Sequence, residues 1–489
     1  MKTTMLSLLL LCCFTTLVIA QSSTISSSNI QLPTLTSEQI QAIASPQKGM
    51  MAFDSNSKCL KYYNGTEWVC SNQQGSDFES QNLALFKGNA NNYDFTYDLE
   101  VDPFGNVYVF NYYFGTVTYG STSFTNNNPI QPLFCLIKFS SSGQVIWAKD
   151  LGQFNNVGKT LTVDNSGNVY INGAKYLPDG TADVANNLSV PKPVFSSNGN
   201  VYGLKNIEGF MQTVNGVTFG CEGQTTPTER GIFAYDSNRN LLWVRYFCGY
   251  NFRFEELITD NAGNCYFTGY FSNYNYDFSG GTNPSAGILY TANDRMRFVG
   301  KYNVNGGFEW VKGVQNTISA NDGITQLIPL GFDEAGNLQL SIGYRANHLT
   351  YGGNVIMATN ACANPDPNGY GNAIELKISS ATGGIISTKQ DHGGEIAISS
   401  GSVYHINAYA CPVSSEICPP KSSQKLFLKK NKANALAWVS TTNATLYTIG
   451  KGADNTIWIG GSFTGSIQFG SASLSTTRPQ SMFLLRIKE

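Results

Sequence analysis

The chain has 489 residues, with 31 Lys and Arg against 33 Asp and Glu, and only 13% of its residues are charged. The formal net charge is −2, and no cluster of Lys and Arg offers the contacts that bind phosphate backbones, so DNA and RNA are set aside as partners. Its 49 Gly, 26 Tyr and 29 Phe suit half-buried strands joined by glycine turns, and the composition favours an extracellular all-β protein.

The first twenty residues, 1–20, predict a signal peptide. Lys2 precedes an apolar run from Met5 to Ala20, and Val18-Ile19-Ala20 before Gln21 has the small-residue character of a cleavage site. The run is short for a bilayer span, which needs about 20 apolar residues, and no other stretch is suitable. We expect a secreted or surface-displayed protein with no membrane span. A Ser/Thr-rich spacer without apolar periodicity follows over residues 21–31.

Residues 32–72 predict a small module with one short helix and a hairpin. The helix is expected to be capped by Thr36 or Ser37 and to end before Pro46, and two strands follow it. Asn64-Gly65 is the tight-turn signal between strands. In its Gly-Met-Met-x-Phe and Tyr-Asn-Gly-Thr-x-Trp motifs the segment resembles a short module that follows the signal peptide of surface proteins from Bacteroidetes-type bacteria.

One turn-and-strand motif recurs over residues 82–489. The copies include VDPFGNVYVF from Val101, VDNSGNVYIN from Val163, SSNGNVYGL from Ser196, TDNAGNCYFTG from Thr259 and FDEAGNLQLSIG from Phe332. Fuller copies add two more strands, and the second of these carries a Trp and a cation, as in VIWAK, LLWVR and EWVK. Four strands in each repeat are the composition of a β-propeller blade.

The repeats resemble a β-propeller family with the pattern Asp-x-x-Gly-Asn-Val-Tyr-Val-x-Gly, followed by Lys-Phe-x-x-x-Gly-x-x-x-Trp. The resemblance implies an all-β propeller of six to seven four-stranded blades, with seven favoured, but no particular chemistry, because such folds carry unrelated functions. Residues 150–201 are either a short degenerate blade or an insertion. The C-terminal unit lacks one strand, so we predict that Leu83 to Lys87 joins it and closes the ring.

Cysteine usage indicates disulfides rather than a metal site. Of the 11 cysteines, Cys12 and Cys13 lie in the signal peptide, and an odd number remains, so at least one is unpaired or bonds another chain. Two local pairs are candidate disulfides in an oxidising compartment: Cys59 with Cys70, and Cys411 with Cys418. Cys265 stands where other repeats have Val, so it is interpreted as a core residue. Zinc is disfavoured because no Cys-x-x-Cys and no neighbouring His supply four ligands.

The Asp residues of the repeat turns suggest either calcium binding or turn formation. One carboxylate per loop is too few for the roughly six to eight oxygens that calcium prefers, so we predict that these Asp side chains hold their turns and expect no cofactor. The Trp residues recur at equivalent places, which predicts packing between blades; a sugar platform should instead be a single arrangement. The residues concerned are Trp147, Trp243, Trp310 and Trp438.

Three sequons predict glycosylation in a eukaryotic host, at Asn64, Asn187 and Asn443, although a turn role alone explains Asn64. The polar, Pro-rich loops over residues 361–371 and 411–421 are the predicted binding face, because loops on a rigid scaffold carry function.

No catalytic motif stands out. The three histidines, His348, His392 and His405, lie far apart without a nucleophile elbow or a metal motif beside them. A Ser-His-Asp arrangement assembled across blades stays open, because triads are recognised by geometry. Neighbouring acids such as Glu255 and Glu256, or Asp333 and Glu334, point to opposite faces of a strand and form no acid/base pair.

We therefore predict a binding scaffold rather than an enzyme, with an unidentified extracellular protein or glycan as its partner. The alternative is an extracellular hydrolase or lyase that acts on a polysaccharide or another polymer at the propeller axis. Convergence of the histidines, or of two carboxylates, at one mouth of the axial channel would favour the enzyme.

Overall fold

The protein is described here from a computed structural model. The described residues are 33–488 except 57–58, 71–82, 88, 91–92, 155–160, 208–210, 221–228, 248–251, 273–274, 280–286, 291–294, 317–323, 345–347, 358–371, 392–394, 400–401, 409–424, 431–435, 443, 453–455 and 470–471. The predicted signal peptide, the spacer and both predicted binding loops lie outside the described residues. The chain divides into two compact units, Met1–Ser76 and Asp77–Glu489.

The first unit is a four-stranded sheet with one short helix. Its strands pair in the order β1 (Thr34–Leu35), β2 (Met51–Asp54), β3 (Cys59–Tyr63) and β4 (Trp68–Cys70). Helix α2 (Ser37–Gln41) begins with a capping box in which Thr36 accepts from the Gln39 backbone and the Gln39 side chain accepts from the Thr36 backbone. The predicted cap is confirmed, and Ile40, Ala52 and Trp68 form the small core.

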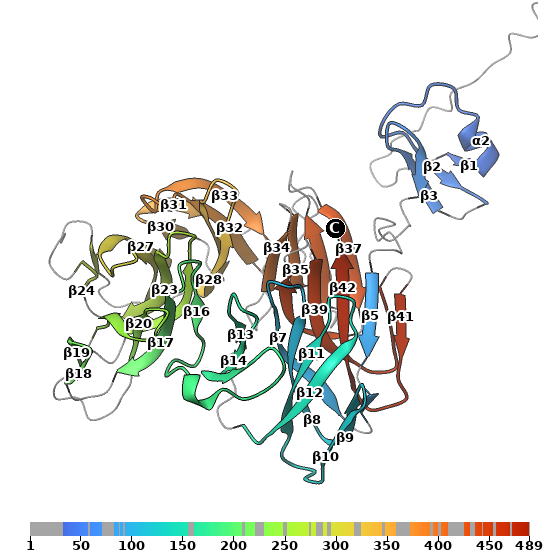
Figure 1. Ribbon diagram of the computed structural model, residues 1–489. Coiled ribbons are helices and arrows are strands. Elements are labelled where there is room, and N and C mark those ends of the chain that lie inside the picture. The colour runs from blue at the N-terminus through green and yellow to red at the C-terminus, as the bar shows by residue number, and fades with distance from the viewer. Residues whose placement is uncertain are drawn as a thin grey trace, which may run out of the picture. The chain divides into compact units, whose positions relative to one another are not determined.

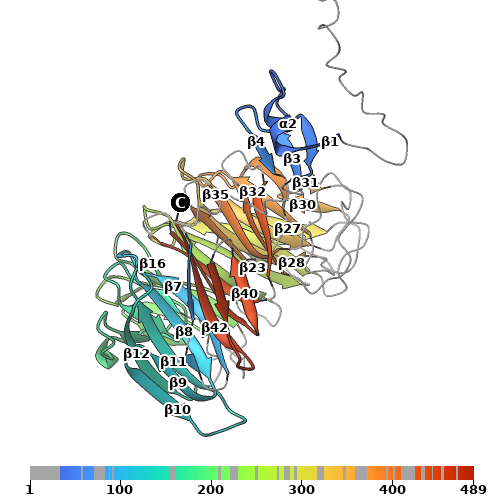
Figure 2. The ribbon, with the colours of Figure 1, turned by 90° about the vertical axis from the view of Figure 1, so that its right-hand side faces the viewer.

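The second unit is a β-propeller built from successive antiparallel sheets (Figures 1 and 2). The first sheet contains β7 (Asp94–Val101), β8 (Val107–Tyr113), β11 (Leu133–Phe139) and β12 (Val145–Gly152). A three-stranded sheet follows, with β13 (Thr162–Val163), β14 (Val169–Ile171) and β15 (Ala174–Tyr176). The third contains β16 (Val194–Phe195), β17 (Val201–Ile207), β20 (Glu229–Tyr235) and β21 (Leu241–Arg245).

The fourth sheet is extended by an extra hairpin. Its strands are β22 (Phe252–Thr259), β23 (Cys265–Ser272), β26 (Arg295–Tyr302) and β27 (Phe308–Asn316), and β27 pairs with the hairpin β30 (Leu349–Tyr351) and β31 (Asn354–Met357). The next two sheets are β28 (Ile324–Phe332), β29 (Leu338–Tyr344), β32 (Asn372–Ile378) and β33 (Ile385–Asp391), then β34 (Glu395–Ser399), β35 (Ser402–Ala408), β36 (Lys425–Lys430) and β37 (Leu436–Thr442).

The last sheet joins the two ends of the second unit. It contains β38 (Thr445–Lys451), β39 (Thr456–Phe463), β42 (Ser481–Lys488) and, from the other end of the unit, β5 (Leu83–Lys87), which lies beside β42 in Figure 1. Leu85 is opposite Leu485, so the predicted pairing of this segment is confirmed. This sheet also packs on the first, because Leu99 shares a core cluster with Trp458 and Leu484. The number of blades stays a prediction.

In four of these sheets a small hairpin lies between the second and third strands in the order given above. These hairpins are β9 (Gly115–Tyr119) with β10 (Thr122–Asn126) and β6 (Asn89–Ala90), β18 (Gln212–Val214) with β19 (Val217–Phe219), β24 (Asn275–Asp277) with β25 (Ile288–Tyr290), and β40 (Ser466–Phe469) with β41 (Ala472–Ser475). Residues 150–201 contain a sheet of their own, β13 to β15, which agrees with a short degenerate blade rather than a loop insertion.

Tyrosine and tryptophan side chains connect several of the sheets to the next one along the chain. The hydroxyl of Tyr108 donates to the carbonyl of Gly167 at 2.7 Å, in the turn of the following sheet, and Tyr202 does the same to Gly263 at 2.6 Å. Three indole N–H groups likewise donate to turn carbonyls of the next sheet, from Trp147 to Pro178, Trp243 to Val304 and Trp310 to Ser380, at 2.9 to 3.1 Å. The predicted role of these three Trp residues in packing between blades is confirmed.

Candidate functional site

The first strands of successive sheets form the axial lining of the propeller. β7 contacts β13 and β38, β22 contacts β16 and β28, and β34 contacts β28 and β38. Four of these strands have a β-bulge near the same place, where the register shifts by one residue. Such a bulge turns the following side chains to the other face. The residue that ends each shift is polar: Asp98, Glu256, Gln326 and Thr448.

Four charged residues, Asp98, Glu100, Lys192 and Glu256, form what we call the axial charge cluster. The Lys192 ammonium lies 3.6 Å from a carboxylate oxygen of Glu256, and both side chains stay nearly half exposed. Asp98 is buried; its oxygens accept from the Leu161 backbone N–H at 3.1 Å and from the Thr448 hydroxyl at 3.5 Å. Beyond the bulge, Asp98 and Glu100 alternate with the core residue Leu99, so they share one face of β7.

The acids of the axial charge cluster differ in their protonation at neutral pH. Burial and, to a smaller extent, the charge of Asp98 raise the pKa of Glu100 to about 8, against the opposing effect of Lys192. Burial alone would lower the pKa of Lys192, but Glu256, Asp98 and Glu100 outweigh it, and the pKa of this ammonium is raised. At neutral pH the site therefore contains a protonated carboxylic acid beside a cation that stays charged.

Aromatic side chains continue this face of the first sheet toward the start of β7. We define the aromatic row as Tyr93, Phe95, Tyr97, Tyr112 and Tyr447. The rings of Tyr93 and Phe95 are parallel within 6°, with centroids 6.5 Å apart, and Phe95 stacks on Tyr112 at 4.6 Å. All five stay at least partly exposed, whereas the neighbouring rings of Phe110 and Phe134 are buried.

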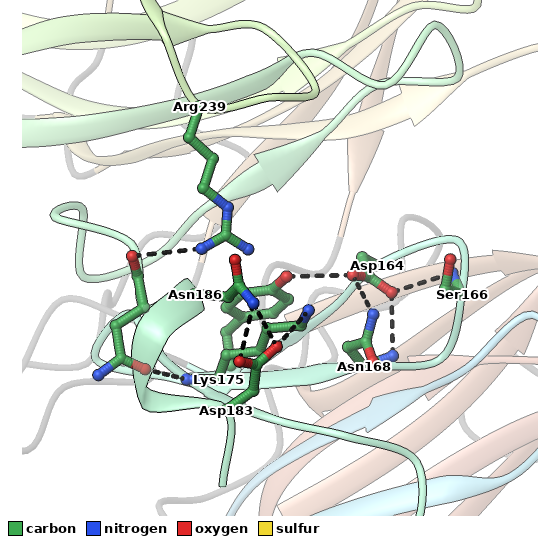
Figure 3. Close-up of polar contacts among 9 residues, drawn as sticks. Asp164, Ser166, Asn168, Lys175, Asp183, Asn186 and Arg239 are labelled. Carbon is green, nitrogen blue, oxygen red and sulfur yellow. Dashed lines mark hydrogen bonds and ion pairs between the residues drawn. The ribbon is translucent and has the colours of Figure 1, made fainter.

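A polar network in the second sheet fixes the segment that leads to Lys192 (Figure 3). The Lys175 ammonium pairs with Asp183 at 3.0 Å, and the Asn186 amide donates to both oxygens of the same carboxylate. The side chain of Asn187 accepts from the Lys175 backbone at 2.9 Å, and Arg239 reaches the Asn187 carbonyl at 3.5 Å. The loop held by this network ends at Pro191-Lys192-Pro193, and its two prolines restrict the backbone on either side of Lys192.

The Asp residues of the repeat turns are occupied by turn donors. Asp102 accepts from the backbone N–H groups of Phe104 and Asn106 at 2.9 and 2.8 Å, and its other oxygen accepts from the Asn106 amide at 2.9 Å. Asp164 repeats the pattern with Ser166 and Asn168 (Figure 3). Gly105 takes a φ of +83°, which an L side chain rarely adopts. This geometry supports the turn role, and no group of three or more His, Cys, Asp or Glu in the described residues is arranged to hold a metal ion.

The cysteine predictions are tested only in part. Cys265 is fully buried in a core cluster, as predicted. Cys70 lies opposite Lys61, which places Cys59 diagonally on the same face of the β3–β4 pair, but both side chains lie outside the described residues. Cys411 and Cys418 lie outside them altogether, so both disulfides stay predictions.

The sequon residues have different surroundings. The side-chain oxygen of Asn64 accepts from the Thr66 and Glu67 backbones and from the Thr66 hydroxyl at 2.8 to 2.9 Å, as a turn residue does. Asn187 is exposed and belongs to the network of the second sheet, while Asn443 lies outside the described residues. Glycosylation stays a prediction at all three.

The structure describes the surroundings of only one of the three histidines, so their convergence at the axis is not tested. His348 directly precedes β30, beyond the outer strand β27, and His405 is in β35, with its side chain outside the described residues, as is the whole of His392. Glu255 pairs with Arg297 at 2.6 Å, while its neighbour Glu256 pairs with Lys192, in agreement with opposite faces. No described helix is long and apolar enough to cross a membrane.

Sequence reasoning missed the axial charge cluster. The signal was present in YDLEV, where two acids interrupt an otherwise apolar strand, but the contribution of Lys192 comes from a segment nearly a hundred residues away. The bulge that sets the direction of Asp98 has no sequence signature of its own.

The comparisons with known proteins concern the two units separately. Residues 16–84 match the family model of the phage tail like trimerisation region, a range that covers most of the first unit and ends two residues into β5. No curated protein matches the chain in sequence.

Solved structures similar to the chain all have low sequence identity. A quinohemoprotein alcohol dehydrogenase from Comamonas testosteroni is 10% identical over 85% of this chain and 78% of its own, with a TM-score of 0.36. The Dos1 propeller is 10% identical over 82% and 95%, with a TM-score of 0.37. A mutant apocarotenoid oxygenase from Synechocystis is 11% identical over 83% and 93%, with a TM-score of 0.39. None of them assigns an activity to this chain.

Proposed function

We propose that the protein is a secreted or surface-displayed binding scaffold that holds an extracellular ligand, a glycan or a protein, at the axis of its propeller. The observation that supports this is the aromatic row lying on the same face of β7 as Asp98 and Glu100. Ligand sites combine aromatic surface with a few placed polar groups. Trp147, Trp243 and Trp310 recur at one place in three of the sheets, whereas this combination occurs once among the described residues.

The first unit is proposed to join three copies of the chain. Its match to the phage tail like trimerisation region supports this, as does the exposed apolar side of its sheet, where Met51 and Phe53 on β2 are 46% and 38% exposed and Tyr62 is opposite Met51. Three linked sites would raise the avidity for a polymer without new contacts. We expect light scattering on the protein from Gln21 onward to give three times the chain mass; a monomer at micromolar concentration would contradict this.

A hydrolase or lyase acting on a polysaccharide is the second candidate. One observation favours it: Asp98 and Glu100 lie on one face, and the raised pKa of Glu100 keeps this acid protonated near neutral pH. A carboxylic acid beside a carboxylate is the pair that general acid catalysis of glycoside cleavage requires.

A glycan and protein array with the protein from Gln21 onward, followed by product analysis of each bound polymer, separates the two functions. We expect binding without released product, and we expect Lys192→Met to weaken it about tenfold or more, because the variant leaves Glu256 and Asp98 without their cation. The control is Glu334→Gln, in an exposed repeat turn away from the axis. Released product that disappears in Glu100→Gln would establish the enzyme instead.

A further inference from the structure

Packing of the fold explains the aromatic row only in part, because Tyr97 and Tyr112 pack against the core cluster that contains Phe110 and Phe134 but do not become fully buried there. Tyr93 is 38% exposed, and Phe95, Tyr97, Tyr112 and Tyr447 keep part of their surface in solvent. Elsewhere on the axial strands, Phe252 and Phe254 of β22 are buried in a dense cluster with Phe271 and Phe298. Aromatic side chains gain stability by burial, so a partly exposed row of five rings indicates a surface that contacts something else.

The row has the geometry of a stacking surface. Three rings, those of Tyr93, Phe95 and Tyr112, are parallel within 17° between neighbours, and Tyr97 and Tyr447 stand edge-on beside them. Burial, with smaller contributions from Tyr447 and Tyr97, raises the pKa of Tyr112 to about 12, so this hydroxyl is neutral. Phe95 and Tyr112 cover each other's facing sides, so a ligand on this surface meets the outer faces and the edges of the rings, bordered by neutral hydroxyl groups.

The aromatic row and the axial charge cluster are next to each other along β7. Along β7, Phe95 and Tyr97 precede the bulge, and Asp98 and Glu100 follow it on the same face. The carboxylate of Asp98 accepts hydrogen bonds, and the protonated Glu100 is able to donate one. With Glu100 protonated, the carboxylates of Asp98 and Glu256 against the one cation Lys192 still give this end a negative potential, which disfavours phosphorylated, sulfated and uronic acid polymers.

We propose that the aromatic row and the axial charge cluster form one elongated site for a neutral polysaccharide chain. The C–H faces of successive sugars stack on the rings, and their hydroxyl groups bond to Glu100, to the exposed carboxylate of Glu256 and to the tyrosine hydroxyls. This inference rests on the proposed binding function and names its ligand class. A protein partner also contacts tyrosines, but it needs no row of parallel rings that ends at carboxylates.

Calorimetric titration of the full chain with cellohexaose, xylohexaose and mannohexaose, and with hexagalacturonate as the anionic comparison, tests the proposal. We expect at least one neutral hexasaccharide to bind, the anionic one to bind at least tenfold more weakly, and Tyr93→Ala or Tyr447→Ala to weaken neutral binding about tenfold. Phe104→Ala is the matched control, because this ring is 67% exposed in a repeat turn, and it should leave the dissociation constant unchanged. If an alanine variant fails to fold, Phe95→Leu replaces it in the test, because leucine keeps most of the apolar volume but has no ring face.

Two results would overturn the inference. If a neutral hexasaccharide binds equally well to the wild type and to all row variants, the ligand lies elsewhere, while the binding function stands. If no neutral hexasaccharide binds at millimolar concentration but an anionic glycan or a protein does, the ligand class is wrong. The absence of any ligand in the array would count against the proposed function itself.

Discussion

Replacing Leu83–Lys87 by Gly-Ser-Gly-Ser-Gly in the full chain should lower the free energy of unfolding by about 5 kcal/mol or more. The last sheet would lose its fourth strand, and five residue pairs with β42, from Phe483 opposite Lys87 to Ile487 opposite Leu83, would lose their hydrogen bonds. β42 is buried along most of its length, with Phe483, Leu484 and Leu485 fully covered, so its new edge would expose apolar surface as well.

Urea unfolding followed by tryptophan fluorescence measures this loss, and size-exclusion chromatography detects association at the new edge. The same replacement at residues 77–81 is the control, since it changes the residues shortly before β5 and keeps the strand. Equal midpoints for the two variants would mean that β5 contributes nothing to the second unit, contrary to the pairing described above.

Stability should depend on pH through Asp94 by about 3 kcal/mol. The side chain is fully buried between the first and last sheets, where it accepts from the Met482 N–H at 2.9 Å and from the Tyr119 hydroxyl at 3.1 Å. Burial is the largest cause of its shift and raises the pKa of Asp94 from 3.8 to about 6, against the effect of these hydrogen bonds and of Arg478. A difference of about two units corresponds to roughly 3 kcal/mol.

The sign follows from proton binding. Between pH 3.8 and about 6 the folded protein holds this proton more tightly than the unfolded chain, so the contribution of Asp94 is most favourable below pH 3.8 and falls as pH rises through 6. In Asp94→Asn the contribution is constant, so the variant should gain on the wild type by about 3 kcal/mol from pH 4 to pH 7. Asp236→Asn is the control of opposite sign, because hydrogen bonding to Asn240 lowers the pKa of that exposed carboxyl. A difference between Asp94→Asn and wild type that stays flat with pH would contradict the assignment.

The repeat architecture was predictable because each of its determinants is local. Asp102, Gly105 and Asn106 form a turn from five consecutive residues, and the strand after it is a short apolar and aromatic run. The position of Leu83–Lys87 was predictable as well, by counting the strands of the last unit. The degenerate second sheet left two alternatives in the sequence, because its strands have only two or three residues each.

The candidate site was not predictable, since its parts depend on features that leave no local pattern. The bulge at Asp98 moves the alternation of β7 by one residue, and Lys192 reaches Glu256 from a loop held by Asp183 and Asn187. In the sequence, His348 was a candidate because of its residue type, and the loop over residues 361–371 was a candidate because of its composition. Aromatic residues are common in the strands of this chain, so the exposure of Tyr93 and Phe95 could be learned only from the structure.

The tyrosine bonds between sheets bear on how such a chain changes in evolution. Tyr108 and Tyr202 each bond to the glycine carbonyl of the turn that begins the second strand of the following sheet. The same few residues therefore form the turn of their own repeat and accept the hydrogen bond from the preceding repeat. A substitution there disturbs both the turn and the junction, so it is selected against on both counts. Because one junction resembles the next, a whole repeat can be duplicated or deleted with matching ends on both sides. The last sheet is the exception, since its strands come from both ends of the unit, and a change of repeat number must spare it.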